Sequence, residues 1–181
     1  PRGWAGGDGP RLRFAVAASN RLHAGGGTEM LSALRAALGS HLAITRQSVS
    51  FDRERPYWLD VEAFQAGVMA EGDVARLQEA IELYRAPLLE GLAPGGAPDF
   101  ELWFLSERER FGQLYLRLLE VLMLRQKTKS DWTAVKATAR QALAANKLQE
   151  PVYCALMEAH AQLGERAEAL RIYDGLRQIL A

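Results

Sequence analysis

The stretch EPVYCALMEAHAQLGERAEALRIYDGLRQILA, residues 150–181, repeats landmarks that lie 34 positions earlier in the chain. Apolar side chains coincide with apolar ones, and small residues coincide with small ones. The matched pairs are Tyr153 with Leu119, Leu156 with Leu122, Met157 with Met123, Gly164 with Ser130, Ala169 with Val135, Tyr173 with Ala139 and Leu176 with Ala142. Stacked helix pairs have this period, and each pair buries one face against its neighbours while a concave face stays free for partners. The repeat therefore indicates binding rather than catalysis.

From Asp60 onward the apolar residues recur with the period of an α-helix. Short turns separate the segments, and turns this short imply antiparallel neighbours. We therefore predict an all-α, tetratricopeptide-like array of antiparallel helix pairs over residues 60–181. The predicted helices cover residues 60–70, 73–87, 100–127, 131–145, 150–163 and 166–180.

Particular side chains are expected at the crossings of this array. Ser130 and Gly164 lie at the tight turns within the two repeats, where a small residue relieves crowding. Tyr153 and Tyr173 are expected to fill the gaps between adjacent pairs. Trp132 follows the first tight turn, and we predict that its ring and that of Tyr173 are buried.

The first part of the chain has a different pattern. Residues 1–27 are rich in glycine and predict an irregular segment. Thr28 is a plausible N-cap for a helix that ends at Gly39, since threonine favours the first position of a helix and glycine the position after its end.

Residues 42–59 are predicted to form a hairpin. The β-branched and aromatic residues within 44–51 favour a strand, and a polar turn follows at Asp52–Pro56. Tyr57–Leu59 then supplies the return strand. A helix followed by a hairpin is the latter part of a winged helix, so residues 28–59 predict a small, partial winged-helix (α+β) region.

Composition and charge limit the class of protein. The 181 residues carry no net charge, but residues 1–59 have a net charge of +4 and residues 60–181 one of −4. A basic head on an acidic helical body is compatible with a nucleic-acid end and a protein-binding end. No apolar run is long enough for a membrane span and no secretion signal is visible, while the single cysteine fits a reducing compartment. We predict a cytoplasmic protein.

Residues suited to catalysis or metal binding do not form a recognisable pattern. Cys154 and His160 are six residues apart, about 240° around one helix, and so do not share a face; the simplest interpretation is a buried structural cysteine and a polar helix residue. The three histidines lack zinc-ligand spacing. The segment Gly25–Thr28 opens a helix but lacks the lysine of a phosphate-binding P-loop. We predict no enzyme activity, metal or cofactor.

Two groups of residues are candidates for binding. Arginine and glutamine suit base edges and phosphates, so a winged helix would use the basic residues of the helix and hairpin against DNA. The alternative is a hairpin with ordinary surface arginines. The DNA candidates are Arg35, Arg46, Gln47, Arg53 and Arg55.

The second group lies in the segment WFLSERER, residues 103–110. Trp103, Glu107, Arg108 and Arg110 are candidates for protein contact, as part of a charged strip beside a groove for a partner helix. The alternatives are that the charged residues lie on a solvated helix face and that Phe100, Trp103 and Phe104 occupy core positions.

Several stretches together resemble one family. They are DVEAF at residues 60–64, LQEAIELYRAPLLEGL at 77–92, WFLSERERF at 103–111, ALM at 155–157 and GERAEALRIY at 164–173. This combination is similar to the bacterial transcriptional activator domain, and the resemblance covers residues 60–181. In that family the domain is a tetratricopeptide-like helical unit that follows a winged helix of the response-regulator type, as in antibiotic-pathway activators.

The resemblance also extends to the end of that winged helix. Leu34–Gly39 is similar to the end of its recognition helix, and Ile44–Arg46 to its first wing strand. Arg11–Phe14 is similar to an early strand, but only a short segment separates it from the helix, where the family has several strands and two helices. The resemblance therefore implies an incomplete DNA-binding unit with weak affinity for DNA.

Three hypotheses follow. The first is a helical protein-interaction and regulatory module of a bacterial transcriptional activator, whose partner is RNA polymerase or another domain of a larger regulator. The second is an autonomous, sequence-specific DNA-binding regulator that acts through the winged helix. The third is a generic tetratricopeptide scaffold unrelated to transcription. No membrane partner is expected.

Overall fold

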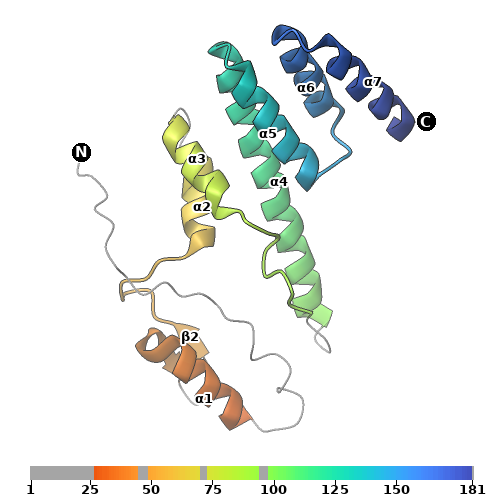
Figure 1. The fold of residues 1–181 in the computed structure, drawn as a ribbon. Coiled ribbons are helices and arrows are strands. Elements are labelled where there is room, and N and C mark those ends of the chain that lie inside the picture. Colours follow the sequence, from red (N-terminus) through yellow and green to blue (C-terminus); the bar gives the residue numbers. More distant parts are fainter. Residues whose placement is uncertain (1–26, 45–48, 70–72, 94–97, 181) are drawn as a thin grey trace. The chain divides into compact units, whose positions relative to one another are not determined.

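The computed structural model describes residues 27–44, 49–69, 73–93 and 98–180 (Figure 1). They form two compact units. The first contains the described residues up to Ala63 together with Leu89–Ala93, and the second contains Phe64–Leu88 and the described residues from Pro98 onward. Helices dominate the second unit, and the described strands lie in the first. This is the predicted fold class, an all-α array with a small winged-helix-like region.

The first unit begins with helix α1 (Gly27–Leu38), one residue before the predicted cap Thr28. The helix ends where we predicted, because Gly39 adopts φ +55°, a conformation that L residues rarely adopt. A short 3₁₀ turn, η2 (Gly39–His41), leads into strand β1 (Leu42–Ile44). Strand β2 (Val49–Phe51) pairs with β1 in antiparallel register, Leu42 opposite Phe51 and Ile44 opposite Val49.

The predicted hairpin is only partly correct. Both paired strands lie before Asp52, so the connection between them falls in residues 45–48, outside the described residues. Asp52 does begin a turn, since its carboxylate accepts from the Glu54 N–H at 3.1 Å. The return strand predicted at 57–59 is wrong. Tyr57 packs edge-on against Phe51, with ring centroids 5.1 Å apart, and this segment has no strand pairing.

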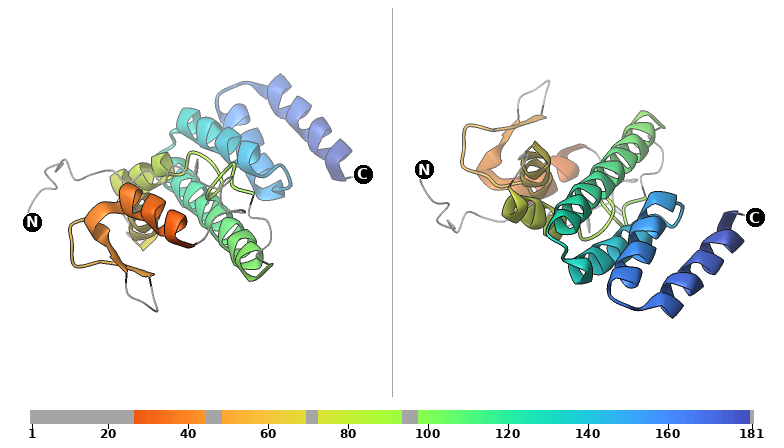
Figure 2. Two further views of the ribbon diagram at one scale, coloured as in Figure 1. Left: turned by 90° about the horizontal axis from the view of Figure 1, so that it is seen from below. Right: turned by 90° about the horizontal axis from the view of Figure 1, so that it is seen from above.

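The second unit is built from consecutive helices. α5 packs on α4, α6 on α5 and α7 on α6 (Figure 2). α3 packs on the long helix α4. The bounds are α2 (Asp60–Met69), α3 (Val74–Leu83), α4 (Pro98–Thr128), α5 (Trp132–Ala145), α6 (Glu150–Gln162) and α7 (Arg166–Leu180).

α3 is shorter than predicted. It ends at Leu83, whereas the periodicity suggested that it runs to Pro87. The residue before a proline is disfavoured in helical conformation. Tyr84 also leaves the helix to stack its ring on Tyr115, with centroids 4.2 Å apart. Burial raises the pKa of both phenols.

The 34-residue repeat is confirmed at the two tight turns. Between α4 and α5 Ser130 has φ +56°, and between α6 and α7 Gly164 has φ +79°. Among the matched small residues, Ser130 and Gly164 lie between helices, whereas the others lie within helices. A residue with positive φ ends each helix here, and a small side chain is best tolerated in that conformation, which is why one recurs.

The hydrogen bonds around these turns also recur at an offset of 34. The Asp131 N–H donates to the Gln126 carbonyl at 3.0 Å, and the Glu165 N–H donates to the His160 carbonyl at 2.8 Å. This six-residue closure is typical of the Schellman motif. The sequence repeat therefore reflects one local structure used twice.

The core follows the apolar stripes of α4 to α6. Leu119, Val135, Ala139 and Ala159 have no exposed surface. Alanines at the crossings allow the helices to approach closely, and the larger side chains fill the space between them. Helices α2 and α3 also approach each other closely at Gly67. A Cβ added to Gly67 would lie 2.3 Å from the Ala80 Cβ.

The predicted burial of two rings is not borne out. Tyr173 is 48% exposed, and Trp132 is half-buried. Ala139, which matches Tyr173 in the repeat, is buried because α5 has α4 on one side and α6 on the other. Among the described helices, α7 packs mainly against α6. The face of α7 that points away from α6 is therefore exposed. A helix long and apolar enough to cross a membrane does not occur among the described helices.

Candidate functional site

An apolar patch is exposed on the first turns of α4. Phe100 (41% exposed) and Trp103 (49%) form this patch on one side of the helix, whereas Leu102 (72%) and Leu105 (59%) are exposed on another side. The rings of Phe100 and Trp103 stack with centroids 5.4 Å apart. Helix α4 has 31 residues and α5 has 14, so α5 cannot cover the whole length of α4. The prediction that Phe100 and Trp103 are core residues is therefore wrong, whereas Phe104 is buried as predicted.

The charged strip that follows this patch is partly structural. Arg108 donates from Nε to the Leu88 carbonyl at 2.7 Å, and its guanidinium lies 4.2 Å from the centre of the Phe104 ring. Arg108 thus fastens the segment after α3 to α4. This contact and its half-buried position make it less available to a partner than the sequence suggested.

The other two charged candidates pair with each other. Arg110 donates from Nε and Nη2 to the Glu107 carboxylate at distances from 2.6 to 3.1 Å. These hydrogen bonds hold the pKa of Glu107 below its ordinary value. The Arg110 guanidinium also lies 4.4 Å from the centre of the Phe111 ring. Glu107 and Arg110 form an ordered, solvent-facing pair beside the apolar patch, and an exposed pair of this kind contributes little to stability.

The DNA candidates are distributed over the first unit. Arg35 lies exposed on α1, and Arg53 is exposed in the turn after β2. Arg55 is also exposed, but its Nε pairs with the Asp52 carboxylate at 3.0 Å. Arg46 and Gln47 lie outside the described residues. The structure thus presents two unpaired arginines for DNA among the described candidates.

A hollow lies between α3, α4 and α5. It has a volume of about 360 Å³ and carries several amide side chains. Gln126 accepts from the Thr138 hydroxyl at 3.0 Å, and Gln141 donates to the Tyr115 hydroxyl at 2.8 Å. The Gln126 amide nitrogen and the Gln141 amide oxygen take no part in these two hydrogen bonds. Sequence analysis missed this groove because its residues come from three helices at irregular spacing.

For the two residues considered for catalysis, the observed burial is the reverse of the predicted burial. Cys154 is exposed, and His160 is buried with 2% of its surface exposed. His160 Nδ1 lies 2.5 Å from the Glu165 carboxylate, which also pairs with Lys136 at 2.9 Å. The repeat contained a signal for this arrangement, since His160 matches Gln126, whose side chain contacts Thr138 of the next helix, α5, while His160 contacts Glu165 just before α7. In the described part of the chain no group of His, Cys, Asp and Glu side chains is suited to hold a metal ion.

Comparison with known proteins gives one match. The family model described as "Bacterial transcriptional activator domain" matches residues 59–181, more than half of the chain. No curated protein and no solved structure matches the chain. The matched range begins just before α2 and includes all the helices of the second unit.

Proposed function

The chain belongs to the bacterial transcriptional activator domain family, and we propose that it acts in the cytoplasm as the protein-contacting, regulatory module of a bacterial transcription regulator. Family membership supports the transcriptional role. The apolar patch on α4, formed by the stacked and exposed rings of Phe100 and Trp103, supports contact with a protein partner. Its partner is RNA polymerase or another domain of a larger regulator.

The patch has the composition of a protein-binding surface. Contiguous exposed apolar side chains mark interaction sites more often than they mark inert surface. Tryptophan dominates the energetic centres of protein interfaces, and Trp103 is already held by stacking on Phe100. The ordered pair Glu107–Arg110 supplies the polar rim that such interfaces need.

Binding to purified bacterial RNA polymerase tests this proposal. The immobilised 181-residue chain is expected to bind the polymerase, and Trp103→Ala is expected to weaken binding at least tenfold, as truncation of an interface tryptophan does. Leu148→Ala is the matched control, since Leu148 is 78% exposed and lies outside the patch. Equal effects of the two substitutions, or no binding of polymerase to the wild-type chain, would count against the proposal.

The DNA-binding alternative has one observation in its favour. The exposed Arg35 lies on the helix, and the exposed Arg53 in the turn after the hairpin, of the region that a winged helix presents to DNA. Two free arginines are few for a specific complex, in which many phosphate and base contacts act together. A generic tetratricopeptide scaffold would share the helical array but would show no selective binding to the transcription machinery.

A further inference from the structure

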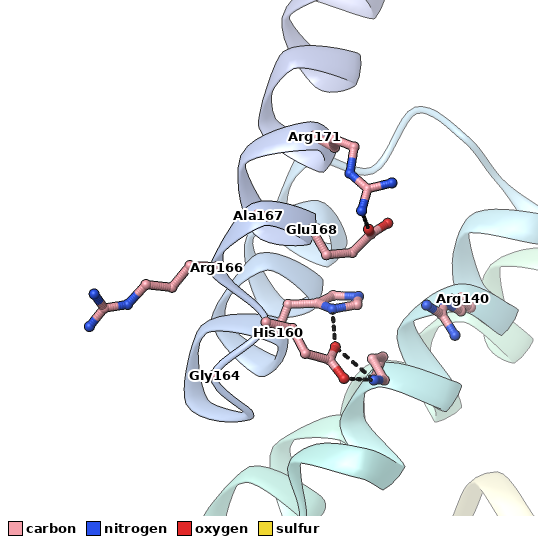
Figure 3. Close-up of a pocket in the computed structure, with 9 residues that line it drawn as sticks. Arg140, His160, Gly164, Arg166, Ala167, Glu168 and Arg171 are labelled. Atoms are coloured by element: carbon pink, nitrogen blue, oxygen red, sulfur yellow. Dashed lines mark hydrogen bonds and ion pairs between the residues drawn. The ribbon is translucent and has the colours of Figure 1, made fainter.

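A basic hollow lies between α5, α6 and the start of α7 (Figure 3). Its volume is about 560 Å³, within the range of small-molecule sites. Four cationic side chains and two carboxylates line it, so the lining carries an excess of two positive charges when His160 is neutral. The charged lining residues are Lys136, Arg140, Arg166, Arg171, Glu165 and Glu168.

Both carboxylates already have cationic partners. Glu165 accepts from Lys136 at 2.9 Å, and Glu168 pairs with Arg171. Arg140 has no ion-pair partner within the described residues, and Figure 3 shows it across the hollow from His160. Arg166 is also without an ion-pair partner among the described residues, but Figure 3 shows its side chain pointing away from His160, so the Arg140 guanidinium is the better placed cation for an anion.

The start of α7 supplies further donors. The first N–H groups of a helix have no intrahelical acceptor and carry the positive end of the helix dipole. The N–H groups of Glu168 and Ala169 donate to the Glu165 carbonyl. Those of Arg166 and Ala167 have no acceptor in the part of the chain that the structure describes, and both residues line the hollow.

A buried and unpartnered nitrogen distinguishes this hollow from an ordinary helix start. His160 is 98% buried and lines the hollow, and its Nε2 has no hydrogen-bond partner among the described residues. In Figure 3 the His160 ring lies beside the Glu168–Arg171 pair, and the ring nitrogen without a dashed line is on the side of Arg140. An unsatisfied buried nitrogen is costly unless a ligand or water completes it.

The protonation of His160 defines what that ligand must offer. The hydrogen bonds from Lys136 and then His160 hold the pKa of Glu165 below its ordinary value, so the carboxylate is ionised and can only accept. Nδ1 must therefore carry the hydrogen. Nε2 then offers a lone pair in the neutral ring and an N–H in the protonated ring, so a ligand group that can both donate and accept suits it in either form.

We propose that this hollow binds a small molecule through a phosphate group. Phosphate oxygens accept from Arg140 and from the free N–H groups at the start of α7. A phosphate group, with a second pKa of about 6, carries acceptor oxygens and also a hydroxyl proton near neutral pH, and so can pair with Nε2 whether Nε2 accepts or donates. Sulfate offers the same acceptors without that proton. Nε2 itself has almost no exposed surface, so lining side chains must move aside as the ligand enters. Binding here is independent of the protein contact proposed for α4.

Isothermal titration calorimetry of the 181-residue chain with inorganic phosphate and with sulfate, at low ionic strength, tests the proposal. We expect saturable 1:1 binding of phosphate with a dissociation constant of about 1 mM or lower, and weaker binding of sulfate. Arg140→Gln should weaken phosphate binding at least tenfold. Arg117→Gln should leave it unchanged, because Arg117 is an exposed arginine of α4 outside the hollow.

ADP and adenosine distinguish the source of the phosphate group. Tighter binding of ADP than of phosphate, with no binding of adenosine, would assign the hollow to a phosphorylated nucleoside; equal binding of ADP and phosphate would assign it to the phosphate group alone. Absence of saturable phosphate binding would overturn the proposal. So would equal losses in Arg140→Gln and Arg117→Gln, or a preference for sulfate.

Discussion

Gly164→Ala tests the turn on which the repeat depends. Gly164 has φ +79°, and a Cβ placed there would meet no atom within 4 Å, so the effect of the substitution comes from the backbone alone. An L residue in the left-handed region costs about 1–2 kcal/mol. The loss of unfolded-state freedom returns about 0.4–1 kcal/mol. We therefore expect Gly164→Ala to lower the free energy of unfolding by about 1 kcal/mol.

Two matched substitutions check the sign of this effect. Gly175 lies inside α7, has an ordinary helical φ and also has open space around its Cβ position. Gly175→Ala should therefore stabilise the protein by about 0.5–1 kcal/mol. Ser130→Gly should also stabilise it, because Ser130 holds φ +56° at the equivalent turn.

Urea denaturation of the full chain, followed by circular dichroism, measures these changes. With a slope of about 2 kcal/mol per molar urea, a change of 1 kcal/mol moves the midpoint by about 0.5 M. The expected order of midpoints places Gly164→Ala below the wild type and Gly175→Ala above it. If Gly164→Ala were as stable as Gly175→Ala, the left-handed turn and the structural repeat would both be refuted.

Three further predictions address the core, the charge cluster and DNA. Leu119→Ala, at a fully buried position of α4, should cost about 2–5 kcal/mol in urea denaturation, whereas Leu124→Ala, at a side chain 61% exposed, should change the free energy by less than about 0.5 kcal/mol; similar losses would show that the stripe of α4 is misassigned. The pKa of Glu165 is lower in the folded chain than its ordinary value of 4.5, so its stabilising effect is complete above that pH and is lost as the pH falls through the folded value. The difference in urea midpoint between wild type and Glu165→Gln should therefore be present at pH 7 and shrink at pH 3, and a constant difference would contradict the ion pair. Titration of fluorescent duplexes should give a dissociation constant no lower than about 10⁻⁶ M at physiological salt, without sequence preference, and nanomolar, selective binding that Arg35→Ala abolishes would support the DNA-binding alternative.

The helical array was predictable because its signals are local. Apolar periodicity defines which face of each helix turns inward, and the 34-residue spacing of Ser130 and Gly164 identifies the two turns that close the pairs. The start of α7 at Arg166 was predicted to the residue. Such features depend on residues within one or two turns of each other, which a single sequence contains.

The surfaces were less predictable because they depend on which elements cover which faces. Tyr173 was predicted to be buried, yet it is about half exposed, since no described helix covers that face of α7. His160 is buried because the start of α7 folds back over it, and its polar character gave no sign of this. The prediction of a return strand at residues 57–59 failed for the same reason. Tyr57 is held by its contact with the Phe51 ring and not by pairing with a strand.

Transcription from a tethered chain tests most directly whether this protein acts through protein contact. The 181-residue chain is fused to an unrelated DNA-binding domain with a known operator, and a reporter promoter carries that operator. We predict activation above that of the DNA-binding domain alone. The activation should be lost when Phe100 and Trp103 are both replaced by alanine and should be retained with Leu148→Ala, at equal protein levels. A fusion that fails to activate, or one that activates equally well without the Phe100 and Trp103 side chains, would contradict the account.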